Sequence, residues 1–186
     1  MNQVMRMDDD GMLSGATFIP SPNCDERPQG CAIDLVVIHN ISLPPGEFGG
    51  KGVIELFTNT LAESAHPYYK EISGLKVSSH FFVNREGKIF QFVPVGKRAW
   101  HAGVSIWRGR EKCNDFSVGI ELEGTDFTPF TTEQYDALKA LTFAIFEKYP
   151  VCDIAGHSEI APGRKTDPGP FFDWNRYRNA LKRLSS

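Results

Sequence analysis

The sequence lacks the features of a small disulfide-stabilised protein. Its 186 residues contain four cysteines, at positions 24, 31, 113 and 152, and no Cys-x-x-Cys pair. This irregular spacing is typical of reduced thiols in a reducing compartment, although a bridge between Cys24 and Cys31 would close a short loop. A chain of this length buries roughly 70% of its unfolded surface without help, so its stability does not require disulfides.

The chain also lacks long apolar runs and basic blocks. No window approaches the ~20 consecutive apolar residues of a membrane span. The acidic amino terminus, with Asp8, Asp9 and Asp10, does not have the basic and then apolar pattern of a signal peptide. The formal net charge is -3, and no segment concentrates lysine and arginine. We therefore expect a cytoplasmic protein that binds neither nucleic acid nor membrane.

Two common catalytic motifs are missing as well. The segment Gly-Arg-Lys-Thr at residues 163–166 lacks the Gly-Lys pair and the upstream glycine of a phosphate-binding loop. No Gly-x-Ser-x-Gly follows a predicted strand, so a serine hydrolase is unsupported. A nucleophile pair of Cys152 and His157 stays open, although Cys152 also suits packing as a small hydrophobic residue.

Short β-branched and aromatic runs predict a sheet. Residues 34–39 have the length and composition of a buried strand, and residues 77–83 and 88–93 predict two strands joined by a four-residue hairpin turn. Residues 116–123 alternate apolar and polar side chains, which is typical of a strand with one face in the core. A last short strand is expected at residues 151–155.

Three helices are predicted around this sheet, at residues 52–60, 131–149 and 174–184. The second starts with a capping box formed by Thr131 and Gln134. Residues 1–30 predict an irregular arm with a short extended piece at residues 16–19. We expect one α/β (α+β) domain over residues 1–186, with a mixed central β-sheet flanked by helices and long loops, one of them at residues 101–115, gathered at one edge.

One loop carries three side chains suited to metal chemistry. Two Pro-Gly pairs favour a structured loop over residues 156–170 rather than a helix or strand. This segment holds His157, Lys165 and Asp167. An imidazole and a carboxylate are typical zinc ligands, and a nearby ammonium group stabilises developing negative charge. A catalytic zinc usually takes three protein ligands, so we expect a third ligand from elsewhere, and His39, at the end of a predicted strand, is the best candidate.

A metal-assisted hydrolysis also needs a general base. Glu121 and Glu123 point to the same side of the predicted strand at residues 116–123, and periodicity alone does not choose between them. Both would be solvated if this strand lay at the edge of the sheet. Lys165 lies two residues before Asp167, so in an extended loop it would project to the same side and could hold an oxyanion.

Four longer motifs carry a resemblance to a known family. They lie at residues 36–50, 97–104, 113–126 and 164–170, in the same order as in the family, and the resemblance covers nearly the whole chain after about residue 14. They closely resemble the AmpD family of cytoplasmic 1,6-anhydro-N-acetylmuramoyl-L-alanine amidases. These enzymes belong to the zinc amidases related to peptidoglycan-recognition proteins, so the resemblance implies the fold of that group.

The resemblance also implies roles for individual residues. It assigns one Zn²⁺ per chain to His39, His157 and Asp167, makes Glu121 rather than Glu123 the catalytic acid and base, and lets Lys165 assist the transition state. The residues that it implies in substrate binding are Asn40, Ala99, Trp100 and Arg164, together with Lys76 and Lys112. These two lysines stand where the family has arginines, which keeps the charge but removes the bidentate fork.

The hypothesis is a monomeric zinc amidase that cleaves the amide between 1,6-anhydro-N-acetylmuramic acid and L-Ala of the stem peptide during cell-wall recycling. Its partner is then an anhydromuropeptide substrate. The alternative of another class is a muropeptide-binding module of the same fold without catalysis, whose mark would be a missing zinc ligand. A thiol amidase built on Cys152 is the second alternative.

Overall fold

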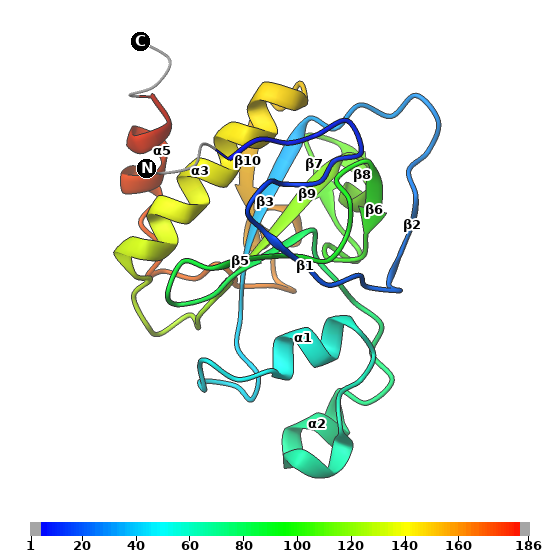
Figure 1. The fold of residues 1–186 in the computed structure, drawn as a ribbon, viewed down its shortest axis with the longest axis vertical. Coiled ribbons are helices and arrows are strands. Elements are labelled where there is room, and N and C mark those ends of the chain that lie inside the picture. The colour runs from blue at the N-terminus through cyan, green and yellow to red at the C-terminus, as the bar shows by residue number, and fades with distance from the viewer. Residues whose placement is uncertain (1–4, 183–186) are drawn as a thin grey trace.

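The computed structural model describes residues 5–182, and its centre is a six-stranded mixed sheet (Figure 1). Strands β4, β9, β3 and β10 are parallel neighbours, β5 runs antiparallel to β4, and β1 is parallel to β5. This arrangement confirms the predicted mixed sheet. In sheet order the strands are β1 (Thr17–Phe18), β5 (Ile89–Gln91), β4 (Phe81–Val83), β9 (Ser117–Glu123), β3 (Leu35–Ile41) and β10 (Asp153–Gly156).

Helices and two small ribbons surround this sheet. Helix α3 crosses one face of the sheet, while α1 and α2 lie together beyond the end at which β3 finishes (Figure 1). The antiparallel ribbons are β2 with β6 and β7 with β8. The bounds are α1 (Gly52–Phe57), α2 (Pro67–Glu71), α3 (Thr132–Lys148), α4 (His157–Ile160), α5 (Trp174–Lys182), β2 (Cys24–Glu26), β6 (Lys97–Ala99), β7 (Ile106–Trp107) and β8 (Arg110–Glu111), with 3₁₀ turns η1 (Glu63–Ala65) and η2 (Cys113–Asp115).

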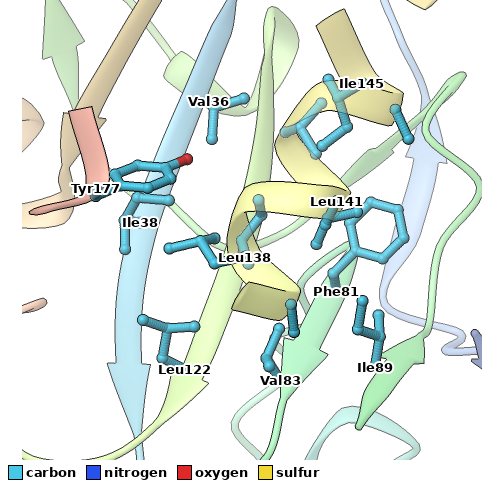
Figure 2. Packing of buried hydrophobic residues seen from close by; sticks show 14 of the residues in the cluster. Val36, Ile38, Phe81, Val83, Ile89, Leu122, Leu138, Leu141, Ile145 and Tyr177 are labelled. Carbon is cyan, nitrogen blue, oxygen red and sulfur yellow. The ribbon is translucent and has the colours of Figure 1, made fainter. Parts of the chain in front are cut away.

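Helix α3 begins as its sequence predicts. The Thr131 hydroxyl accepts a hydrogen bond from the Gln134 N–H, and the Gln134 side chain accepts one from the Thr131 N–H, each at 3.1 Å. This capping box satisfies donors that a helix start leaves unpaired. The apolar side of α3 then packs on the sheet, with Leu138, Leu141 and Ile145 facing Val36, Ile38, Phe81, Val83 and Leu122 (Figure 2).

The predicted hairpin and closing helix are also present. The Asn84 N–H donates to the Lys88 carbonyl at 3.1 Å, and Gly87 has a φ of +77°, which suits glycine in such a turn. In α5, Tyr177 and Leu181 are buried, and the Tyr177 hydroxyl lies 2.6 Å from that of Thr142. The end of this predicted helix at residues 183–184 lies outside the described residues.

Two expectations differ from the structure, and one open alternative is excluded. Residues 156–170 are not loop throughout, because the turn after β10 continues into the short helix α4 before the proline-rich segment. The expected long loop at residues 101–115 contains the β7–β8 ribbon and the turn η2. Strand β9 lies between β4 and β3 rather than at the edge, so its two glutamates are buried instead of solvated.

The arm before residue 31 is more ordered than its composition predicts. It adds β1 to the edge of the main sheet and pairs β2 with β6. Its Arg27 guanidinium donates to the main-chain carbonyls of Val95, Asn114, Asp115 and Ser117 at 2.8–3.2 Å. Among residues 5–182, no helix has both the length and the apolar character needed to cross a membrane.

Candidate active site

Three adjacent parallel strands bring two of the predicted ligands and the predicted base to one place. Strand register pairs His39 of β3 directly with Glu121 of β9. On the other side of β3, Gly156 of β10 pairs with Ile38, so the next residue, His157, enters α4 beside His39. The three side chains are almost fully buried, at 0%, 8% and 4% exposure for His39, Glu121 and His157.

His39, His157 and Asp167 point one atom each at a common position. The Nδ1 atoms of His39 and His157 are 2.9 Å apart, and Asp167 Oδ2 lies 3.0 Å from the first and 3.1 Å from the second. Atoms that share a tetrahedral zinc ion at about 2.0–2.1 Å lie roughly 3.3 Å from one another. The three donors therefore match a zinc ion after a shift of a few tenths of an ångström, and their two nitrogens and one oxygen are typical zinc ligands.

The protonation of these groups suits a metal site. Burial lowers the pKa of His39 to about 4, although the adjacent Asp167 carboxylate opposes this shift, so the ring is neutral at pH 7. Burial alone would raise the pKa of Asp167, but the adjacent His157 and His39 rings outweigh it and hold the pKa below its ordinary value. Neutral imidazoles and an ionised carboxylate are the forms that bind a metal.

Glu121 is a buried carboxyl group without a hydrogen-bonded partner for one oxygen. Its Oε1 lies 3.9 Å from His39 Nδ1, and its Oε2 has no hydrogen-bond partner among the described residues. Burial raises the pKa of Glu121 well above its usual range, the charge of Asp167 adds to this, and Lys165 opposes it. A carboxyl group whose pKa is raised in this way is a candidate for a general acid and base.

Glu123 is committed to main-chain contacts. Its Oε1 accepts a hydrogen bond from the Gly49 N–H at 2.5 Å, and its Oε2 accepts one from the Arg85 N–H at 3.0 Å. The same face of β9 thus carries two different carboxyl groups. Glu123 binds the loop after β3 through Gly49. Of the two glutamates, Glu121 is therefore the one with an oxygen that no hydrogen bond from residues 5–182 occupies.

A cleft of about 660 Å³ opens in front of these groups. Asn40, Arg164 and Lys165 line it, together with Glu121, His157 and Asp167. The other four predicted substrate residues are not among the lining residues. Ala99 is fully buried in β6, Trp100 follows it half-buried, Lys112 is exposed before η2, and Lys76 lines a neighbouring hollow of about 210 Å³.

Among the cleft residues that were not predicted, Asp126 and His101 contact predicted site residues. Asp126 accepts a hydrogen bond from the Asn40 side-chain amide at 2.7 Å, which orients that amide at the cleft wall. His101 is 8% exposed and lies against His39. A possible signal for His101 was its place between Trp100 and Gly103 in a predicted loop, but a single histidine there does not reveal its partner.

The structure does not support the thiol alternative. The ring nitrogens of His157 lie within 3.1 Å of His39 Nδ1, Asp167 Oδ2 and the Ala102 carbonyl. Cys152 instead contacts the Asp34 carbonyl, with 3.6 Å between sulfur and oxygen. A nucleophilic thiol needs a hydrogen bond to its base, and Cys152 has none to His157.

Comparison with known proteins identifies the family. The family model described as N-acetylmuramoyl-L-alanine amidase (Amidase_2) matches residues 29–170. The chain belongs to the N-acetylmuramoyl-L-alanine amidases. Within them it is 56% identical over 172 residues to the 1,6-anhydro-N-acetylmuramyl-L-alanine amidase AmpD of Escherichia coli (strain K12), covering 90% of this chain and 93% of the relative. The AmpD of Enterobacter cloacae is 53% identical over 175 residues, covering 93% of this chain and 94% of that protein.

Solved structures agree with this assignment. A crystal structure of an AmpD derivative superimposes on this amidase with a TM-score of 0.93 at 53% identity, covering 95% of this chain and 99% of that one. Drosophila PGRP-LB, at 22% identity, has a TM-score of 0.55 over 90% of this chain and 87% of its own. The amidase therefore has the predicted peptidoglycan-recognition-protein-like fold, and it is an enzyme of the AmpD group.

Proposed function

We propose that this amidase cleaves the bond between 1,6-anhydro-N-acetylmuramic acid and L-Ala of the stem peptide, in a zinc-dependent reaction of muropeptide recycling. The convergence of His39, His157 and Asp167 on one point beside the free carboxyl group of Glu121 carries the proposal. The printed names of its AmpD relatives support the bond and the sugar. AmiD of E. coli, 27% identical with a TM-score of 0.60, has been solved with anhydro-N-acetylmuramic acid-L-Ala-D-gamma-Glu-L-Lys.

The proposed site holds one Zn²⁺ per chain through His39 Nδ1, His157 Nδ1 and Asp167 Oδ2. When bound, this ion polarises the scissile carbonyl and lowers the pKa of a water molecule. The carboxylate of Glu121 takes the proton of the attacking water and passes it to the leaving nitrogen, which its position and raised pKa support. Lys165 lines the same cleft, where its ammonium group stabilises the negative charge of the tetrahedral intermediate.

The proposed substrate contacts lie on the cleft walls. Asn40 and Arg164 line the cleft directly, and the Arg164 guanidinium also donates to the Ala102 and Val104 carbonyls at 2.7 and 2.6 Å, which holds it in place. Ala99, Trp100, Lys76 and Lys112 remain predicted contacts of the sugar and peptide. We propose that the enzyme acts as a single domain and a monomer in the cytoplasm, on free anhydromuropeptide.

Release of the L-Ala peptide from an anhydromuropeptide, assayed with and without a chelator, tests this function. Activity should disappear with the chelator and return with zinc. Replacement of Glu121 by alanine should retain zinc while turnover falls by about 10²–10⁴-fold, the usual contribution of a general acid and base. Zinc-independent turnover would overturn the metal role, and full activity of Glu121→Ala would overturn the role of the base. A non-catalytic binding module would bind the muropeptide and release no peptide.

A further inference from the structure

His101 is a buried ring that no part of the proposed mechanism uses. It lies beneath the metal site, with its Nδ1 atom 2.9 Å from Nε2 of His39 and its ring edge-on to that of His39 at 88°. The chain makes room for it at Gly119 of β9, where any Cβ atom would lie 2.5 Å from the His101 ring. A glycine in the middle of a buried strand lowers the stability of that strand. Its presence at position 119 therefore indicates that the space is kept for the His101 ring.

The hydrogen bonds around His101 have only one consistent direction. The Ser117 hydroxyl lies 2.6 Å from the Cys113 carbonyl, and since a carbonyl can only accept, the single hydroxyl proton points there. Ser117 Oγ, 3.1 Å from His101 Nε2, must therefore accept the proton that Nε2 carries. A neutral His101 then has a bare Nδ1, which accepts a proton from Nε2 of His39.

The same direction follows from the metal side. Nδ1 of His39 lies beside Asp167 and His157, and it must offer a lone pair there to bind a cation. A neutral His39 then carries its proton on Nε2, where it needs an acceptor. His157 follows the same pattern, because its Nε2 lies 3.1 Å from the Ala102 carbonyl and its Nδ1 faces the site. The Ala102 carbonyl accepts the Nε2 proton of His157, and Nδ1 of His101 accepts the Nε2 proton of His39.

We infer that His101 is a positioning residue, which accepts the Nε2 proton of His39 and so fixes the tautomer in which His39 presents Nδ1 to the metal. Ser117 and the Cys113 carbonyl fix His101 in turn. An imidazole is an unusual acceptor for a ligand histidine, since carboxylates, carbonyls and water are the common ones. The inference rests on the proposed zinc site. It adds that strong zinc binding requires His101 as well as the three ligands.

The test compares two replacements of nearly equal size. His101→Asn places an amide oxygen near the position of Nδ1, whereas His101→Leu has the same branched shape and no acceptor. Zinc affinity, measured by competition with a chelating dye, should fall about 10–100-fold in the leucine variant, the usual effect of losing such a partner. The asparagine variant should recover most of this loss. In ¹⁵N-histidine NMR spectra of the metal-free protein, His39 should carry its proton on Nε2 in the unaltered chain and lose this preference in His101→Leu.

Ser117→Ala provides a second variant, because it removes the hydroxyl that fixes the His101 tautomer and leaves the acceptor ring in place. Both rings should then show mixed tautomers. Its matched control is Ser105→Ala, since the buried Ser105 hydroxyl bonds to Gly103 and Cys113 and does not touch His101. Equal zinc affinities of the asparagine and leucine variants, or an unchanged His39 tautomer in Ser117→Ala, would overturn the inference. Failure of His39→Ala to weaken zinc binding would instead overturn the proposed metal site.

Discussion

At the scale of single residues, the site places two carboxyl groups, Asp167 and Glu121, next to the imidazole rings of His39 and His157. Asp167 is ionised between two imidazoles, while Glu121 has an oxygen without a partner. A buried carboxylate without a partner destabilises the folded state. In the metal-free protein, the Glu121 carboxyl group should therefore lower the free energy of unfolding.

Replacing Glu121 by glutamine should stabilise the metal-free protein at alkaline pH. Since burial raises the pKa of Glu121 above its unfolded value of 4.5, its favourable contribution is complete below that value and is lost as pH rises through the folded pKa. The glutamine variant does not titrate there. The difference in unfolding free energy should thus grow as pH rises above 4.5, to about 1–3 kcal/mol, measured by urea unfolding with a chelator present. A difference that is independent of pH would contradict this.

Replacing Lys165 by methionine should separate charge from packing at the cleft. The side chain is exposed and lines the cleft, so the change should leave folding and zinc content unaltered. If the ammonium group stabilises the oxyanion, kcat should fall about 10²–10³-fold with little change in KM. Steady-state kinetics on an anhydromuropeptide measures this. A higher KM with unchanged kcat would show that Lys165 binds the ground state instead.

At the scale of elements, local sequence patterns predicted the features that depend on residues close together in the chain. The capping box of α3, the 84–87 hairpin turn and the buried strand at β3 all follow from signals within a few positions of each other. The burial of Glu121 and Glu123 was not predictable in this way. It follows from the place of β9 in the middle of the sheet, and strand order is a property of distant segments.

The proximity of His39, His157 and Asp167 was predictable because each residue lies next to a strand end or a proline-rich turn. His101 was not, because its role depends on a hydrogen bond to a residue 62 positions away and on the space above Gly119. Helix α4 was missed since it is only four residues long and precedes the two Pro-Gly pairs that predicted a loop.

Glu123 links two elements, and its replacement by alanine should loosen the loop after β3. The change leaves the Gly49 and Arg85 N–H groups without their acceptor, which should lower the unfolding free energy by about 1–3 kcal/mol. Ser42, Leu43, Pro45 and Gly46 of this loop line the cleft, so KM should rise more than kcat falls. Urea unfolding and steady-state kinetics together measure both effects.

The matched control is Thr131→Ala, which removes the cap of α3 and should cost about 1 kcal/mol. Thr131 is not among the residues that line the cleft, so KM should stay unchanged. If both variants raised KM alike, the effect would come from general destabilisation and not from the loop.

At the scale of the whole molecule, the amino-terminal arm ties together segments that carry the site. Arg27 is held by four main-chain carbonyls, and one of them belongs to Ser117, the residue beneath His101. Burial lowers the pKa of Arg27 to about 10, so it still carries its charge at neutral pH. The arm therefore stabilises the residues beneath the site, although the arm and these residues are far apart in sequence.

Arg27→Met should lower the unfolding free energy by about 2–4 kcal/mol, because it leaves the carbonyls of Val95, Asn114, Asp115 and Ser117 without their donor. Arg98→Met is the matched control. Arg98 also joins the arm to η2, through Asp25 and Asp115, but its side chain is 29% exposed and solvent screens these pairs, so about 1 kcal/mol or less is expected. Urea unfolding of both variants decides the matter. If Arg27→Met and Arg98→Met lowered the unfolding free energy equally, surface ion pairs would hold the arm as strongly as the buried contacts do. The buried contacts of Arg27 would then not explain why residues 5–30 are ordered.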